Sequence, residues 1–112
     1  MSKVFSMHMI ALKPGVKAED FEKFVTEVYP LRSLEGMKRY LLKGDRGDRV
    51  GKYLMMLEFE SVEARDRLFP APGEMSKQAQ QAFEAEAVAM EKWAAFATPV
   101  GDIYTDYVVV GR

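Results

Sequence analysis

Residues 4–12 read VFSMHMIAL, and this stretch sets the expectations for the whole fold. Side chains of a β-strand point alternately to the two faces of a sheet. One face of this strand then carries Val4, Ser6, His8, Ile10 and Leu12, and the other carries Phe5, Met7, Met9 and Ala11. Neither face is predominantly polar, so we expect the strand to be covered on both sides.

The segments that follow predict a helix and then a hairpin. Lys13-Pro14-Gly15 ends the first strand with a strong turn signal. An amphipathic helix is predicted next, because apolar residues recur at i, i+3, i+4 and i+7, and Pro30 ends it; these residues are Phe21, Phe24, Val25 and Val28. Two further strands, 37–43 and 52–60, flank the glycine-rich stretch 44–51, which is typical of a hairpin loop.

The last third of the chain predicts two helices and a final strand. Ser61 is expected to cap a short helix that runs to Phe69, before Pro70-Ala71-Pro72-Gly73 breaks it. A single long helix is predicted over about residues 75–96, and residues 98–101 are expected to form a turn. The β-branched and aromatic stretch from Ile103 to Val110 reads as the last strand.

This element order predicts an α+β fold of the ferredoxin-like sandwich type. With the second helical stretch counted as one broken crossover, the order is a split βαβ pattern, in which a four-stranded antiparallel sheet has helices on one face. The chain has 112 residues, which suits one domain over residues 1–112.

The apolar second face of the sheet predicts a homodimer. Leaving a large apolar side chain in water forgoes about 1.5 to 3 kcal/mol, and a second copy is the simplest cover. The residues expected at this interface are Phe5, Met7, Met9, Leu54 and Met56. The alternative is a sheet that stays half exposed.

Composition narrows the function classes. The chain has no cysteine, which excludes disulfides, thiolate nucleophiles and Cys-ligated metals. Its formal net charge of -1 makes nucleic acid an unexpected partner. Neither a leader segment nor a membrane-spanning stretch is evident, so a cytoplasmic protein without membrane contact is expected. We predict no metal site and no cofactor.

Two motifs resemble those of the stress-responsive A/B barrel proteins, a family of dimeric α/β barrels. Residues 8–16, HMIALKPGV, followed by an acidic amphipathic helix, are similar to the opening of that family. Residues 57–64, LEFESVEA, resemble its third strand running into the next helix. The resemblance covers roughly the first two thirds of the chain. It implies a ferredoxin-like protomer that dimerises through its sheets into a barrel.

The resemblance also implies a pocket between sheet and helices. In the polyketide-cyclase branch of the family this pocket uses the strand-one His, a second His after the short helix, and His or Tyr residues in the wall. The matching positions here carry His8, the segment 70–74, Tyr53 and Leu68. The second histidine is absent, so the one imidazole of this chain lacks the partner that the aldol chemistry of the cyclase branch uses.

His8 is the leading candidate for catalysis, because imidazole is the side chain whose ordinary pKa lies near neutrality. We hypothesise that His8 acts as general acid or base and that Tyr53 orients a small aromatic or polyketide-like substrate in a cofactor-independent, cyclase-like or monooxygenase-like enzyme. The predicted pocket-lining residues are Ile10, Met55, Leu57, Leu68, Trp93 and Tyr107. Alternatively, His8 is a core histidine and the chain is a non-catalytic dimeric ligand-binding or stress-associated protein.

Two aspartates on the last strand need a separate interpretation. Asp102 and Asp106 share one face of that strand. Paired carboxylates suit acid-base work or a hard cation. No third ligand follows at a recognisable spacing, so solvated edge charges are the favoured interpretation.

Overall fold

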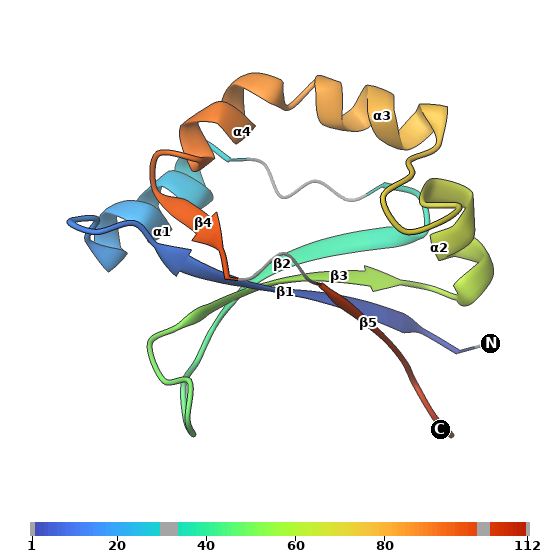
Figure 1. Cartoon of the computed structure of the whole chain (residues 1–112), viewed down its shortest axis with the longest axis horizontal. Coiled ribbons are helices and arrows are strands. Elements are labelled where there is room, and N and C mark those ends of the chain that lie inside the picture. The colour runs from blue at the N-terminus through green and yellow to red at the C-terminus, as the bar shows by residue number, and fades with distance from the viewer. Residues whose placement is uncertain (1, 30–33, 101–103, 112) are drawn as a thin grey trace.

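The computed structural model describes residues 2–29, 34–100 and 104–111. Within these residues the strands are β1 (Val4–Leu12), β2 (Met37–Lys43), β3 (Tyr53–Phe59), β4 (Ala97–Pro99) and β5 (Thr105–Val108). The helices are α1 (Ala18–Glu27), α2 (Val62–Leu68), α3 (Lys77–Glu84) and α4 (Ala87–Trp93). All of these helices lie on one side of the sheet, as Figure 1 shows, so the chain has the predicted α+β class.

The sheet is antiparallel and its order is β2-β3-β1-β4, with β5 also paired to β1. The two last strands share one edge of β1: Ile10 pairs with Pro99 in β4, and Val4 pairs with Val108 in β5. The described residues therefore form five strands where four were predicted, and their order is compatible with a ferredoxin-like fold.

Residues 98–101 were expected to form a turn, and that expectation is wrong for Thr98 and Pro99, because they belong to β4. Backbone hydrogen bonds on both sides of β4 hold this strand against the end of β1. The amide of Lys13 donates to the carbonyl of Phe96 at 2.8 Å, and the amide of Val100 donates to the carbonyl of Met9 at 2.8 Å. The predicted helix stop at Pro30 and the predicted strand start at Ile103 lie outside the described residues.

The alternation predicted for β1 is confirmed. Val4 is 0% exposed and Ile10 is 6% exposed beneath the helices, whereas Met9 on the opposite face is 43% exposed. The same parity runs through β3, because Ser6 pairs with Leu57 and His8 pairs with Met55. The face of the sheet away from the helices is uncovered in the single chain (Figure 1).

The capping prediction at Ser61 is confirmed, and the prediction of one long helix is wrong. The Ser61 hydroxyl accepts a hydrogen bond from the amide of Ala64 at 3.0 Å and so starts α2. The long helix instead divides into α3 and α4, which follow each other over the sheet (Figure 1). Glu86 stands at the division, where it turns inward and leaves helical geometry.

The inward turn of Glu86 creates a buried ion pair with Arg39 of β2. One guanidinium nitrogen of Arg39 donates to both carboxylate oxygens of Glu86, at 2.7 and 2.9 Å, and the two side chains are 5% and 6% exposed. The pair lies beside Phe83, whose ring centroid is 5.7 Å from the guanidinium carbon. It ties the division between α3 and α4 to the sheet.

Two apolar clusters fill the space between helices and sheet. The first holds Ile10, Phe21, Phe24, Val25, Tyr29, Tyr53 and Ala97, with Trp93 and Phe96 packed against it. The second holds Val4, Met37, Phe59, Leu68 and Ala79. Among the described residues, no helix is both long enough and apolar enough to cross a bilayer.

We predict that Glu86→Ala destabilises the fold by about 3 to 5 kcal/mol, because it leaves the Arg39 guanidinium buried without its carboxylate. The exposed Glu84, at the end of α3, provides the control, and Glu84→Ala should change the free energy of unfolding by about 0.5 kcal/mol or less. Urea denaturation of both variants measures the difference. Equal stability of the two would show that the ion pair contributes nothing.

Candidate functional site

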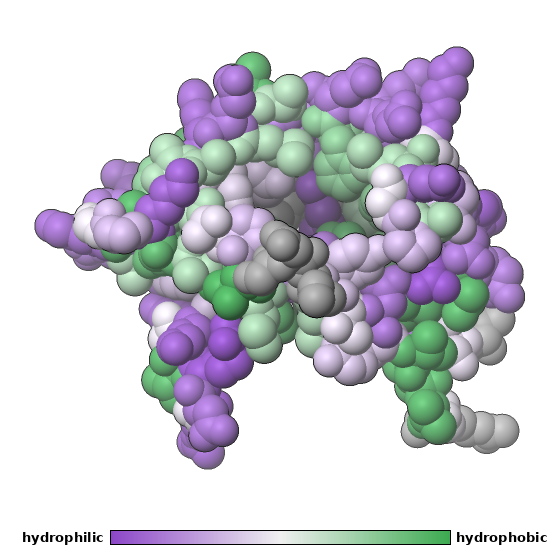
Figure 2. Space-filling model, in the orientation of Figure 1, coloured by the Kyte–Doolittle hydropathy of each residue, from purple (hydrophilic) through white to green (hydrophobic). Residues whose placement is uncertain are grey.

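A pocket of about 440 Å³ lies between the sheet, α2 and the loop that leads to α3. From the sheet and the residue that precedes β5, its wall contains Ser6, His8, Leu57, Phe59, Tyr104 and Asp106. From α2 and the loop, it contains Arg65, Asp66 and residues 69–75. In the view of Figure 2 the surface is hollowed between the helical layer and the sheet. The volume falls in the range of small-molecule sites.

His8 enters this pocket from the middle of β1. Its Nε2 lies 3.1 Å from the hydroxyl oxygen of Ser6, two residues earlier on the same face. Its ring stacks on that of Tyr104, with 5.2 Å between the centroids and 20° between the planes. Burial lowers the pKa of His8 below its ordinary value of 6.5, and the charge of Asp106 opposes that shift. The imidazole is therefore neutral at pH 7 and can accept a proton.

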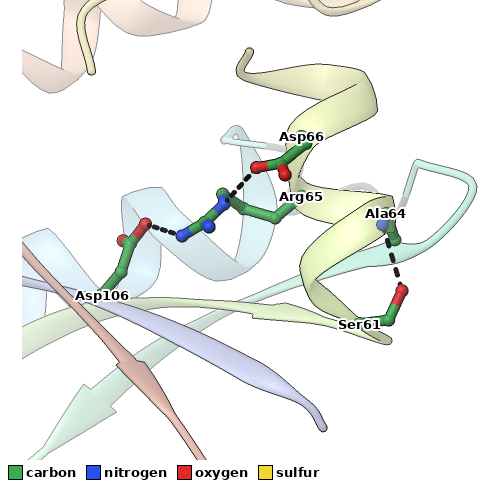
Figure 3. Close-up of polar contacts among 5 residues, drawn as sticks. All are labelled: Ser61, Ala64, Arg65, Asp66 and Asp106. Carbon is green, nitrogen blue, oxygen red and sulfur yellow. Dashed lines mark hydrogen bonds and ion pairs between the residues drawn. The ribbon is translucent and has the colours of Figure 1, made fainter. Parts of the chain in front are cut away.

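Arg65 joins α2 to β5 beside the imidazole. Its Nη1 donates to Asp106 Oδ2 at 2.8 Å, and its Nε donates to Asp66 Oδ1 at 2.9 Å (Figure 3). The Ser61 cap fixes where α2 starts and so places Arg65 one turn later, facing the sheet. Asp106 pairs across the strands with Ser6, which puts its side chain on the helix-covered face.

The other oxygen of Asp106 is without a hydrogen-bond partner among the residues that the structure describes. Asp106 Oδ1 is buried and accepts no hydrogen bond from the described part of the chain. A buried carboxylate oxygen normally accepts at least one hydrogen bond. The residue that lines the pocket here therefore contains a buried acceptor that is unsatisfied among the described residues.

The predicted site residues divide between this pocket and the apolar clusters. His8 and Leu57 line the pocket, and Met55 is the half-buried cross-strand neighbour of His8 on the same face. Ile10 and Trp93 belong to the first apolar cluster, and Leu68 belongs to the second. These last three fill space that the sequence interpretation assigned to the pocket.

The structure does not bring Tyr53 and His8 together. Tyr53 pairs with Ile10 further along the strand and is 2% exposed within the first cluster. Its hydroxyl donates to the carboxylate of Glu22, which also accepts a hydrogen bond from Lys43 at 2.8 Å. Burial and the hydrogen bond to Glu22 raise the pKa of Tyr53 to about 12. This phenol serves packing and a surface network.

The predicted placement of Tyr107 is also corrected. Tyr107 pairs with Phe5 and lies on the uncovered face, 55% exposed. Tyr104 and Asp106 instead occupy the His8 side of the last strand. Asp106 is not a solvated edge charge, because its side chain is 23% exposed and ion-paired. Asp102, its suggested companion, lies outside the described residues.

The polar groups in the wall can support proton transfer. Ser6, His8 and Asp106 are the residue types of a nucleophilic triad, but Asp106 bonds Arg65 and leaves the imidazole without the carboxylate hydrogen bond that a triad requires. Over residues 2–29, 34–100 and 104–111, no three His, Asp or Glu side chains gather closely enough to hold a metal ion. Acid-base chemistry by the neutral imidazole is what the arrangement offers.

Comparisons with protein-family models, curated proteins and solved structures gave no significant match to this chain.

We predict that the single histidine titrates below its ordinary pKa of 6.5 and that Asp106→Asn lowers the value further, because the variant removes the charge that stabilises imidazolium. Proton NMR of the imidazole measures both values. An unchanged or higher pKa in Asp106→Asn would show that the carboxylate does not act on His8.

The same shift makes stability depend on pH. The folded chain binds the His8 proton less readily than the unfolded chain, so the free energy of unfolding falls as the pH drops through 6.5 toward the lowered value. His8→Gln removes this contribution, and the wild type should lose more stability than the variant over that interval. Denaturation at two pH values tests this comparison.

Proposed function

We propose that the pocket beside His8 takes up a small aromatic or polyketide-like compound, and that the chain is a cofactor-independent enzyme of cyclase-like or monooxygenase-like kind. One observation carries this proposal: a partly buried, neutral imidazole stands in the wall of a 440 Å³ pocket. Apolar side chains that line the same pocket, among them Leu57, Phe59 and Met75, suit a ligand of this class.

The chemistry assigned to His8 is transfer of one proton. A neutral ring nitrogen accepts a proton from a carbon acid between two carbonyls, or from a phenol, and becomes imidazolium. The charge of Asp106 favours that cation, and the imidazolium then returns the proton to an oxygen of the product. Tyr104, stacked on the ring, limits how the imidazole can turn.

The resemblance to the stress-responsive A/B barrel proteins supports the same location. Segment 70–74, the position of a second histidine in the cyclase branch, lines the pocket that contains His8. This chain has no histidine there, and the polar side chains that line the pocket with His8 include Arg65, Tyr104 and Asp106.

A second candidate function is non-catalytic binding of the same ligand class, as in a dimeric ligand-binding or stress-associated protein. This function is favoured because polar groups of the wall already bind one another. Arg65 donates to two carboxylates, and the Ser6 hydroxyl is hydrogen-bonded to His8. Such a wall can bind a ligand, and the imidazole of His8 is then the one reactive group of the wall.

We expect His8→Gln to lower turnover by about a hundredfold or more, because general acid-base groups contribute roughly that factor. The assay follows loss of 1,3-diketone and phenol substrates by mass spectrometry. Tyr53→Phe is the matched control, and since Tyr53 lies outside the pocket its rate should stay within about threefold of wild type. Binding without turnover by wild type would favour the second function, and full activity of His8→Gln would exclude the first.

We also propose a homodimer through the uncovered sheet face. Phe5, Met7, Leu54 and Met56 are half-buried there, and Met9 is 43% exposed. Water contact on this apolar surface is unfavourable, and a two-fold partner presents the same surface in return. Lys3 forms an ion pair with the carboxylate of Glu58 on this face, with 3.1 Å between nitrogen and oxygen. Because this charge already has a partner within the chain, burying it against a second copy does not leave it unpaired.

We predict that light scattering gives twice the 12.7 kDa chain mass at micromolar concentration, and that Met9→Lys gives the monomer. Met90→Lys is the matched control, because Met90 on α4 is 42% exposed and far from that face. A wild-type monomer, or a dimer that survives in Met9→Lys, would contradict the interface.

A further inference from the structure

The hydrogen bond between Ser6 and His8 decides which nitrogen of the imidazole carries the hydrogen of the neutral ring. The hydroxyl oxygen of Ser6 lies 3.1 Å from Nε2, Ser6 is 4% exposed, and both residues line the pocket. In a neutral imidazole one nitrogen donates and the other accepts, so the hydrogen bond made at one nitrogen fixes the tautomer. The direction of this one bond therefore determines what the other nitrogen, Nδ1, can bind.

The surroundings of Ser6 indicate the direction. Within the described residues, Nε2 of His8 is the one hydrogen-bond partner of the Ser6 hydroxyl. If Nε2 carried the hydrogen, Ser6 would accept it, and the hydrogen of a buried hydroxyl would be left without an acceptor. Such an unsatisfied donor is unfavourable. The arrangement that satisfies both groups has the hydroxyl as donor, Nε2 as acceptor and the ring hydrogen on Nδ1.

Nδ1 of His8 makes no hydrogen bond within the chain and is open to contact. Its ring is half-buried in the pocket wall, and none of the described residues bonds to Nδ1. In the part of the chain that the structure describes, Asp106 Oδ1 is the one buried side-chain oxygen or nitrogen that lacks a hydrogen bond. Nδ1 also lacks one, so it is not buried. It is therefore the ring nitrogen that a ligand can reach.

We infer that Ser6 is a positioning residue that holds neutral His8 in the Nδ1–H tautomer, so that the imidazole presents a hydrogen-bond donor to the ligand. This inference rests on the proposed pocket and adds the polar group that its ligand carries, an acceptor such as a carbonyl oxygen or an aromatic nitrogen. The acceptor is uncharged, because the guanidinium of Arg65 in the wall is already bound to two carboxylates. In the proposed reaction the proton is then accepted by Nε2, beside the Ser6 hydroxyl.

Nitrogen-15 NMR of the full chain at pH 8, where the ring is neutral, tests the tautomer. His8 is the single histidine, so the imidazole signals have one source. The chemical shift of each ring nitrogen depends strongly on whether that nitrogen carries hydrogen. We expect the shift of a protonated nitrogen at Nδ1 and that of an unprotonated nitrogen at Nε2. A wild-type ring with its hydrogen on Nε2 would overturn the inference without any variant.

Three variants test the role of Ser6 in the same measurement. Ser6→Ala removes the hydroxyl, so the share of the Nδ1–H form should fall. Ser6→Thr keeps a hydroxyl at this position and should keep that form. Ser2→Ala makes the alanine change at an exposed position before β1 and should leave the imidazole signals unchanged. A folded Ser6→Ala variant with the wild-type tautomer would show that Ser6 does not position the ring.

Two flat bicyclic probes of similar size test the consequence for binding, in NMR titrations at the same pH. The ring nitrogen of isoquinoline accepts a hydrogen bond, whereas the N–H group of indole donates one. We expect wild type to bind isoquinoline about three- to tenfold more tightly than indole, which is the range of one net hydrogen bond. Ser6→Ala should lose most of this difference, and Ser2→Ala should keep it.

Equal binding of the two probes by wild type, or tighter binding of indole, would overturn the donor role of His8 while the ligand pocket stands. Binding of neither probe would overturn the proposed pocket together with the ligand group assigned to it. The tautomer of the free chain would still decide the role of Ser6 in that case, so the two failures are distinguishable.

Discussion

The antiparallel register of β1 against its neighbours is the constraint on which the rest of the structure depends. Ser6 faces Leu57 on one side and Asp106 on the other, and His8 faces Met55. Because side chains alternate across a strand, a slip of one residue would move every one of them to the other face. The helices would then cover Phe5 and Met7, and His8 would lie on the uncovered side. Pocket and register are therefore fixed together.

The two ends of the covered layer are filled in different ways, and this difference decides where a pocket can exist. At the α1 end, Phe21 packs its ring within 5.0 Å of Tyr53 and 5.1 Å of Trp93, centroid to centroid. Rings at these distances leave no room for a ligand. At the α2 end the wall is a proline-rich loop beside a half-exposed last strand, and a cavity remains. Tyr53 lies on the same sheet face as His8 and Trp93 of α4 packs over that face, but both side chains fill the closed end.

Alternation and spacing predict local structure well when each residue's own strand or helix decides the outcome. The bounds of β1 and β2, the amphipathic α1 and the cap at Ser61 are of this kind. Outcomes that depend on distant partners were missed. Glu86 divides the long helix because Arg39, 47 positions away, receives it. Residues 98–101 were predicted to form a turn, but pairing with the edge of β1 makes Ala97–Pro99 a strand.

The last strand shows the same limit within the site itself. Its alternation correctly groups Tyr107 with Thr105 and separates both from Asp106, but the grouping does not say which set faces the helices. Which set of side chains faces the helices is decided by how this edge strand pairs with β1. From the sequence, the charge of Asp106 predicted a solvent-exposed side chain. Its partner Arg65 is 41 positions away and has the sequence pattern of a surface residue of α2.

Polar residues interrupt an otherwise apolar surface at one place only on the helix-covered side of β1. Val4, Ile10 and Leu12 follow the rule for a core face, and Ser6 and His8 break it. Asp106 breaks it again on the neighbouring strand, where an unsatisfied oxygen costs about 1 to 3 kcal/mol. Apolar residues at these positions would pack the α2 end as tightly as the α1 end. A chain that forgoes this stability at adjoining positions of two strands has the pattern expected of a functional site, because such departures concentrate where binding or chemistry needs them.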